Sequence, residues 1–317
     1  MDIINKVRAF NQDLVKYYEI SINDLNPISD KTVKLYDSKG NAYFLKETKI
    51  NALEKYRFLE SQGVHNVIYP IKNRKNDYVT RTMSQAFYLN NYYDDYTIVK
   101  EAKAQQLFNE LNNIHDKTAY SRQLNPSTSR PKFEEITNRL DYKYKMLENY
   151  VRSVEAKPLD IYSMPILANY QYFLDAKKEL VRLQKRIIST IKAKESVDYS
   201  FIHNNPKLDH LLNIDGGSFL VSIDNGKIGV ESLDLAKYYV ENEDLNVDYK
   251  SIIKRRYKNS NPFYYDYFRY MVLLIYIARL NISTDEYISA GEFITTSNSI
   301  KKYFKNFSDY EDTNEEV

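Results

Sequence analysis

Residues 199–239 read YSFIHNNPKLDHLLNIDGGSFLVSIDNGKIGVESLDLAKYY, and the order of elements within this stretch predicts the fold of the whole chain. Its first part is a short apolar strand, Phe201-Ile202, that leads directly into His203. A polar loop over residues 204–210 follows, with a proline and several short polar side chains typical of loops. The sequence therefore predicts that a short strand leads to His203 and that a polar loop follows it.

The second part of the stretch predicts a β-hairpin. Asp215-Gly216-Gly217 lies between two apolar runs, residues 211–214 and 219–223, and an Asp-Gly pair in this position is a strong hairpin signal. The hairpin ends at Asp224. Leu233-Asp234-Leu235-Ala236 then begins a helix.

The first 95 residues combine strand and helix patterns. Alternating apolar residues predict strands, and three-and-four spacing predicts helices. Gly63 follows the second helical pattern and marks its end. The expected elements are a helix over 2–18, strands over 32–37 and 41–47, a helix over 51–62, and strands over 67–71, 78–82 and 86–90.

Beyond residue 95 the periodicity is mostly helical. Residues 124–131, LNPSTSRP, predict a loop by their proline and hydroxyl content. The acidic residues 308–317 predict a frayed tail. The expected helices cover residues 98–114, 132–155, 165–196, 231–241, 247–258, 263–280 and 284–306.

Composition excludes several classes of protein. The 45 basic and 43 acidic residues leave a net charge of +2, which does not favour nucleic acid as a partner. The absence of cysteine excludes disulfides and thiolate chemistry, and it favours a reducing, cytoplasmic location. We expect no secretory signal in residues 1–12. The longest apolar run, residues 271–278, is too short to span a membrane.

In its order of strand, His-x-x loop, hairpin, aspartate and helix, the chain resembles the protein-kinase-like small-molecule kinases, the superfamily of aminoglycoside and choline phosphotransferases. Within it the spore-coat kinase-like branch is most similar. The resemblance implies an α+β fold with two lobes. Residues 1–95 would form an N-lobe with an antiparallel sheet and an inserted helix, residues 96–307 a larger helical C-lobe with the catalytic-type loop, and residues 308–317 the tail.

The resemblance also implies ATP with Mg²⁺ as cofactors and assigns residues to them. Lys46 matches the strand lysine that contacts the nucleotide phosphates, and Glu54 matches the acid that orients it. A surface lysine and a surface glutamate are an equally good interpretation of this pair taken alone. Tyr88 and Leu89 would supply the hinge backbone that meets the adenine, unless they form a plain edge strand. Lys207 matches a phosphate-contacting lysine.

The catalytic loop departs from the family pattern H-x-D-x-x-x-x-N at both functional positions. His203 is present, but Asn205 stands where the catalytic aspartate belongs, and a neutral amide cannot accept the substrate proton. His210 stands in place of the metal-ligating asparagine, and Mg²⁺ prefers oxygen ligands. Asp224 matches the remaining metal ligand. Asp234 matches the structural aspartate that braces the loop.

These departures favour a degenerate, pseudokinase-type protein that binds or scaffolds an unidentified small molecule or protein. The spore-coat branch further implies association with a spore coat. The alternative is an active ATP-dependent phosphotransferase for a small hydroxyl or amino substrate, which Lys46, Glu54, Lys207 and Asp224 keep open.

Overall fold

The computed structural model describes residues 3–82, 85–96 and 98–307, so the predicted acidic tail over 308–317 lies outside the described residues. The fold class is α+β, as predicted. By compactness the chain divides into two units, residues 1–119 with 200–228 and residues 120–199 with 229–317. The lobe boundary expected near residue 95 stays a prediction.

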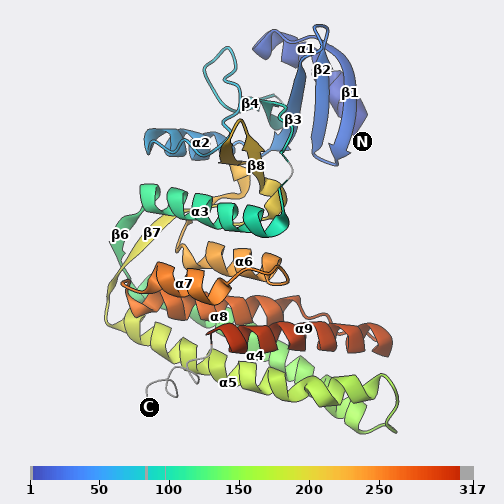
Figure 1. Ribbon diagram of the computed structural model, residues 1–317, viewed down its shortest axis with the longest axis vertical. Coiled ribbons are helices and arrows are strands. Elements are labelled where there is room, and N and C mark those ends of the chain that lie inside the picture. The colour runs from blue at the N-terminus through green and yellow to red at the C-terminus, as the bar shows by residue number, and fades with distance from the viewer. Residues whose placement is uncertain (1–2, 83–84, 97, 308–317) are drawn as a thin grey trace. The chain divides into compact units, whose positions relative to one another are not determined.

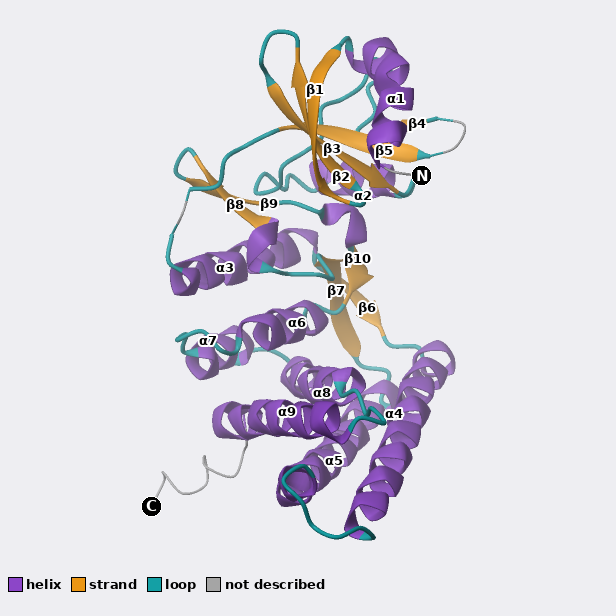
Figure 2. Ribbon diagram, turned by 90° about the vertical axis from the view of Figure 1, so that its right-hand side faces the viewer, coloured by secondary structure: helices purple, strands orange, loops and turns teal. Residues whose placement is uncertain are grey.

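A five-stranded antiparallel sheet forms the centre of the first unit (Figure 2). Its order is β1-β2-β3-β5-β4, and α1 (Ile3–Tyr18) packs on it through Leu14. Inward-facing side chains alternate along the strands, as expected for a sheet with one buried face. The strands are β1 (Ile22–Ser29), β2 (Thr32–Asp37), β3 (Ala42–Thr48), β4 (Thr80–Arg81) and β5 (Ala86–Asn91). The buried core is Leu14, Val33, Leu35, Leu45, Phe87 and Leu89.

Three features of this sheet differ from the expectation. Strand β1 was not predicted, because its sequence INDLNPIS is polar and contains a proline; it is a mostly exposed edge strand, and the register shifts beside Pro27. Residues 67–71 do not form a strand and make only one isolated bridge, from Val67 to Leu220. The strand predicted over 78–82 is shortened to β4.

The predicted hairpin is confirmed, with a shorter second strand. Strands β8 (Leu211–Ile214) and β9 (Gly217–Leu220) are joined by Asp215 and Gly216, whose φ angles are 49° and 79°. Two successive positive φ angles define the tight two-residue hairpin turn, so the second strand begins at Gly217. The first unit also contains α2 (Ala52–Ser61), α3 (Lys100–Thr118) and the single-turn helices η1 (Leu208–His210) and η2 (Ile223–Asn225).

The second unit is mainly helical (Figure 1). Helix α5 packs against α4, α8 and α9. A short strand β6 (Tyr120–Gln123) pairs with the start of β7 (Ser196–Ile202). No described helix is both long and apolar enough to cross a membrane. The helices are α4 (Pro126–Glu155), α5 (Ser163–Lys192), α6 (Ser232–Asn242), α7 (Tyr249–Tyr257), α8 (Pro262–Arg279) and α9 (Glu286–Phe307).

The loop predicted over residues 124–131 is wrong, because α4 already begins at Pro126. The Asn125 side chain caps the helix by accepting a hydrogen bond from the Ser127 backbone N–H at 3.0 Å. Proline is well suited to the first helical position, where its missing N–H has no partner to lose. Pro131 lies inside the helix. The same residues that indicate a loop therefore form a helix start.

Candidate functional site

An ion pair between Lys46 and Asp224 forms the centre of the candidate site in the first unit. The Lys46 Nζ atom lies 2.7 Å from Asp224 Oδ1 and 3.3 Å from Ser222 Oγ. The Thr48 hydroxyl donates to the second carboxylate oxygen at 3.4 Å. The two charged side chains are only 13% and 10% exposed. The backbone places them there because β3 carries Lys46 and the single turn η2, after Ser222 in the left-handed region, carries Asp224.

Helix α2 presents Lys55, rather than Glu54, to this centre. The Lys55 Nζ atom donates to the Asp224 backbone carbonyl at 2.5 Å. Burial lowers the pKa of the Lys55 ammonium, and the charge of Asp224 partly offsets that effect. Glu54 is exposed, and among the residues that the structure describes it has no hydrogen bond or ion pair. The structure therefore does not bring Glu54 to Lys46.

The spacing along α2 explains this arrangement. Ala52, Tyr56 and Leu59 are the buried residues of the helix. At 100° per residue, Lys55 lies beside this face, whereas Glu54 is two positions from both Ala52 and Tyr56 and points away from it. The apolar pattern of residues 52–59 therefore already indicates that Lys55 faces inward.

The catalytic-type loop is held by its two histidines. His203 is buried; its Nε2 atom lies 2.8 Å from the Val221 carbonyl, and its Nδ1 atom accepts from the Asn205 N–H at 3.4 Å. These contacts require the neutral imidazole with the proton on Nε2. His210 Nδ1 donates to the Asn205 carbonyl at 2.7 Å. Both histidines therefore fix the loop backbone around Asn205.

A cavity of about 720 Å³ opens beside the ion pair within the first unit. Lys46 and Tyr88 lie opposite each other in the β3–β5 ladder, and both line this cavity together with His210 and Ser222. The Lys46 ammonium lies 5.9 Å from the centre of the Tyr88 ring. Burial raises the pKa of the Tyr88 hydroxyl well above its usual range, so this side chain stays neutral. The cavity is thus bordered by a cation and an aromatic ring.

Three other predicted residues lie away from this cavity wall. Leu89 belongs to the sheet core, and its carbonyl accepts from the Ile71 N–H at 2.7 Å. Lys207 is exposed. Asp234 is fully buried in the first turn of α6, in the second unit. The hinge role of Leu89, the phosphate contact of Lys207 and the bracing role of Asp234 stay predictions.

The residues at the predicted metal positions do not fit a Mg²⁺ site. Of the two residues only Asp224 carries oxygen ligands, whereas His210 offers an imidazole whose Nδ1 atom already holds Asn205. Mg²⁺ requires near-octahedral oxygen ligands. Within the described ranges, no group of three or more His, Asp or Glu side chains is arranged to hold a metal ion.

Comparison with known proteins shows the fold. No protein-family model matches the chain, and no curated protein sequence is significantly similar to it. Solved structures do match. An aminoglycoside phosphotransferase from Alicyclobacillus acidocaldarius superposes with a TM-score of 0.63 at 12% identity, covering 95% of this chain and 96% of that chain.

The chain has the fold of the protein-kinase-like small-molecule kinases. Choline kinase LicA from Streptococcus pneumoniae matches with a TM-score of 0.51 at 13% identity, covering 94% of this chain and all of that one. A thermostable mutant of aminoglycoside phosphotransferase APH(4)-Ia, in a ternary complex with ADP and hygromycin B, matches with a TM-score of 0.54 at 12% identity. The match covers 95% of this chain and 99% of that chain. The expected two-lobed kinase-like fold is therefore confirmed.

Proposed function

We propose that this chain is a degenerate kinase-fold protein that binds a nucleotide-type anion without catalysing metal-dependent phosphoryl transfer. The observation that carries the proposal is the Lys46–Asp224 ion pair, together with the His210 contact to the Asn205 carbonyl. In phosphoryl transfer the aspartate holds the metal and the lysine holds the phosphates. Here the two side chains neutralise each other.

The cavity beside Lys46 suits the base and phosphates of a nucleotide. Its volume of about 720 Å³ lies within the ordinary range of small-molecule sites. Tyr88, Tyr92 and Tyr93 supply aromatic walls, and Lys31 and Lys46 supply cations. Three carboxylates also line the cavity, so the phosphates must lie beside the two lysines; these are Asp30, Asp95 and Asp209. An arriving phosphate can take Lys46 from Asp224. A neutral Asn205 leaves no carboxylate at the position of the catalytic base.

Melting curves with and without nucleotide test the binding. ATP at about 100 times its dissociation constant adds about 2.7 kcal/mol of stability, which raises the midpoint by a few degrees. We expect the same shift with Mg²⁺ and with EDTA. Lys46→Ala should abolish the shift. Lys39→Ala, which removes an exposed lysine from the β2–β3 turn, is the matched control and should leave the shift unchanged.

A strict requirement for Mg²⁺, or an undiminished shift in Lys46→Ala, would count against the proposal. An absence of any shift with ATP, ADP or GTP would remove nucleotide as the ligand.

Restoring the family pattern in the loop tests the absence of catalysis. Asn205→Asp with His210→Asn rebuilds the base and metal positions, and general-base help is worth about 10²–10⁴-fold. We expect no gain in ATP hydrolysis. The reason is that His210→Asn removes the hydrogen bond that holds the loop carbonyl, and Pro206 restricts residue 205 to extended backbone angles. Magnesium-dependent hydrolysis in the double variant would favour the active phosphotransferase instead.

We also retain two predictions: a cytoplasmic location, which follows from the absence of cysteine, and an association with a spore coat in a sporulating host, which follows from the family resemblance. Imaging of a fluorescently tagged chain during vegetative growth and sporulation would test both. A signal that stays diffuse throughout sporulation would remove the spore coat from the proposal.

A further inference from the structure

A second cavity, of about 290 Å³, lies entirely within the second unit. It is bounded by β6, the first turns of α4, the end of α5 and the start of α8, and Figure 2 shows how β6 leads into α4. Its volume is at the lower end of the range for small-molecule sites, so it suits a ligand of fragment size. The nucleotide-type function proposed above does not use this cavity.

The inner wall of this cavity is apolar. Five of its lining side chains belong to the hydrophobic core and are at most 6% exposed. They come from three helices and the β6–α4 connection, so the wall is part of the packed unit rather than a surface depression. A ligand must place hydrocarbon or an aromatic ring against this wall, because a polar group there would lose its hydrogen bonds to water. The five residues are Leu124, Phe133, Ile187, Ile191 and Phe263.

The rim of the cavity is cationic. Arg122 and Lys132 line it, and no aspartate or glutamate does. Within the part of the chain that the structure describes, neither cation forms an ion pair, and the Arg122 guanidinium lies 5.9 Å from the centre of the Tyr199 ring. Two cations on one rim, with no carboxylate among the lining residues, give this cavity a positive electrostatic potential. They favour an anion and repel a cation.

Neutral donors complete the lining. Ser129 and Tyr267 both line the cavity. Burial raises the pKa of Tyr267 to about 12, so its hydroxyl keeps its proton at neutral pH. Neutral hydroxyls can donate to an anion without bringing a negative charge of their own.

We propose that this cavity binds a small organic monoanion with an apolar body, of the class of medium-chain or aromatic carboxylates. The apolar body fills the inner wall, and the carboxylate meets Arg122 and Lys132 at the rim. Arginine is suited to this role because its planar guanidinium makes two parallel hydrogen bonds to a carboxylate. Inorganic phosphate would leave the apolar wall unfilled, and a neutral hydrocarbon would leave both cations unused.

Isothermal titration calorimetry of the full chain with octanoate tests the proposal. We expect saturable binding of one octanoate per chain. Octanol keeps the apolar body but lacks the carboxylate, and acetate keeps the carboxylate but lacks the apolar body. Each should therefore bind at least about tenfold more weakly than octanoate. Octanol binding as tightly as octanoate would overturn the anionic part of the proposal.

Substitutions at the rim provide the second arm. Arg122→Gln and Lys132→Gln remove exposed cations, so the fold should survive, and each should weaken octanoate about tenfold or more. Lys145→Gln, an exposed lysine on the same helix α4 but outside the cavity lining, is the matched control and should bind like the unmodified chain. Ser129→Trp should block the cavity. Equal affinity in all four variants, or no octanoate binding at millimolar concentration, would overturn the proposal.

Discussion

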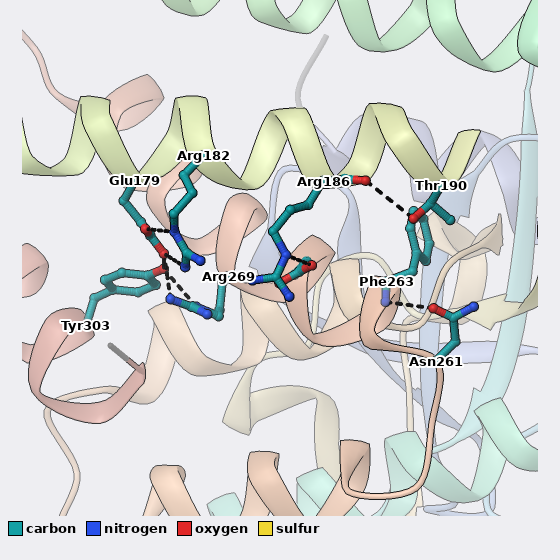
Figure 3. A network of polar contacts seen from close by, with 9 residues as sticks. Glu179, Arg182, Arg186, Thr190, Asn261, Phe263, Arg269 and Tyr303 are labelled. Carbon is teal, nitrogen blue, oxygen red and sulfur yellow. Dashed lines mark hydrogen bonds and ion pairs between the residues drawn. The ribbon is translucent and has the colours of Figure 1, made fainter. Parts of the chain in front are cut away.

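Each unit of the chain contains an ion pair that is largely shielded from water, and the two pairs have different surroundings. In the second unit, the Arg269 guanidinium on α8 lies 2.5 Å from the Glu179 carboxylate on α5, with side-chain exposures of 2% and 11% (Figure 3). Arg182 adds two hydrogen bonds to the same carboxylate, and the Tyr303 hydroxyl on α9 accepts from Arg269 at 3.3 Å. The pair and the Tyr303 hydroxyl together join α5, α8 and α9.

The Lys46–Asp224 pair of the first unit lies beside a cavity instead. Lys46 itself lines that cavity, and its other polar contact is a serine hydroxyl at 3.3 Å. A buried charge needs partners on every side to recover its lost hydration. The Glu179–Arg269 pair has them from protein groups, whereas Lys46 retains one side on which a ligand can bind. This difference favours a structural role for the Glu179–Arg269 pair, and it supports the binding role proposed for Lys46.

The largest expected effect is on the structural pair. Glu179→Ala leaves the Arg269 guanidinium buried without its carboxylate, and breaking a buried pair in this way costs about 3–5 kcal/mol. Glu135→Ala, which breaks the exposed Arg139–Glu135 pair on α4, should cost less than about 1 kcal/mol. Urea denaturation measures both. Equal losses of unfolding free energy in the two variants would show that the Glu179–Arg269 pair contributes no more to stability than an exposed ion pair.

The next effect compares two aspartates, one in each unit. Asp234 is fully buried in the first turn of α6, whereas Asp224 borders the cavity with a 10% exposed side chain. We expect Asp234→Ala to cost about 1–3 kcal/mol, because buried donors are left unpaired, and Asp224→Ala to cost less, because water can reach Lys46. The two denaturation midpoints decide the ranking. A greater loss in Asp224→Ala would mean that the ion pair of the first unit also has a structural role.

Much of the fold could be predicted because its signals are local. The Asp215-Gly216 turn fixes the β8–β9 hairpin by backbone geometry alone, and Gly63 marks the end of the α2 region. Strand β1 was missed because an exposed edge strand needs few apolar residues. The start of α4 was missed because Asn125-Pro126 can begin a helix as well as a loop.

The sequence predicts where the residues of the candidate site lie in the chain, but not which of them contact one another. The positions of His203, Lys46 and Asp224 follow from the order of elements. The contact between Lys46 and Asp224 joins residues 178 positions apart, and no local pattern reports such a contact. Lys55 is different, because the buried face of α2 already indicates that it points inward.

A smaller effect separates the two neighbours on α2. Lys55→Met removes the hydrogen bond to the Asp224 carbonyl, and a loss of about 1 kcal/mol is expected. Glu54→Gln changes an exposed side chain and should stay within about 0.5 kcal/mol of the unmodified chain. Chemical denaturation of the two variants gives the answer. If Glu54→Gln were the more damaging, the inward side of α2 would be assigned incorrectly.

The smallest effect is the pH dependence that Lys55 contributes. Burial lowers the pKa of Lys55 in the folded chain below its ordinary value of 10.5, so between those two pKa values the unfolded chain binds more protons than the folded one. The free energy of unfolding must therefore rise with pH in that window, relative to Lys55→Met, which has no proton to release. Denaturation of both proteins at several values between about pH 8 and about pH 10 measures the difference. Buried tyrosines are common to both proteins, so their titration cancels in the comparison. Parallel curves would show that the Lys55 ammonium is as well hydrated as a surface lysine. A difference that falls with pH would show that the attraction of Asp224 outweighs the burial of the ammonium.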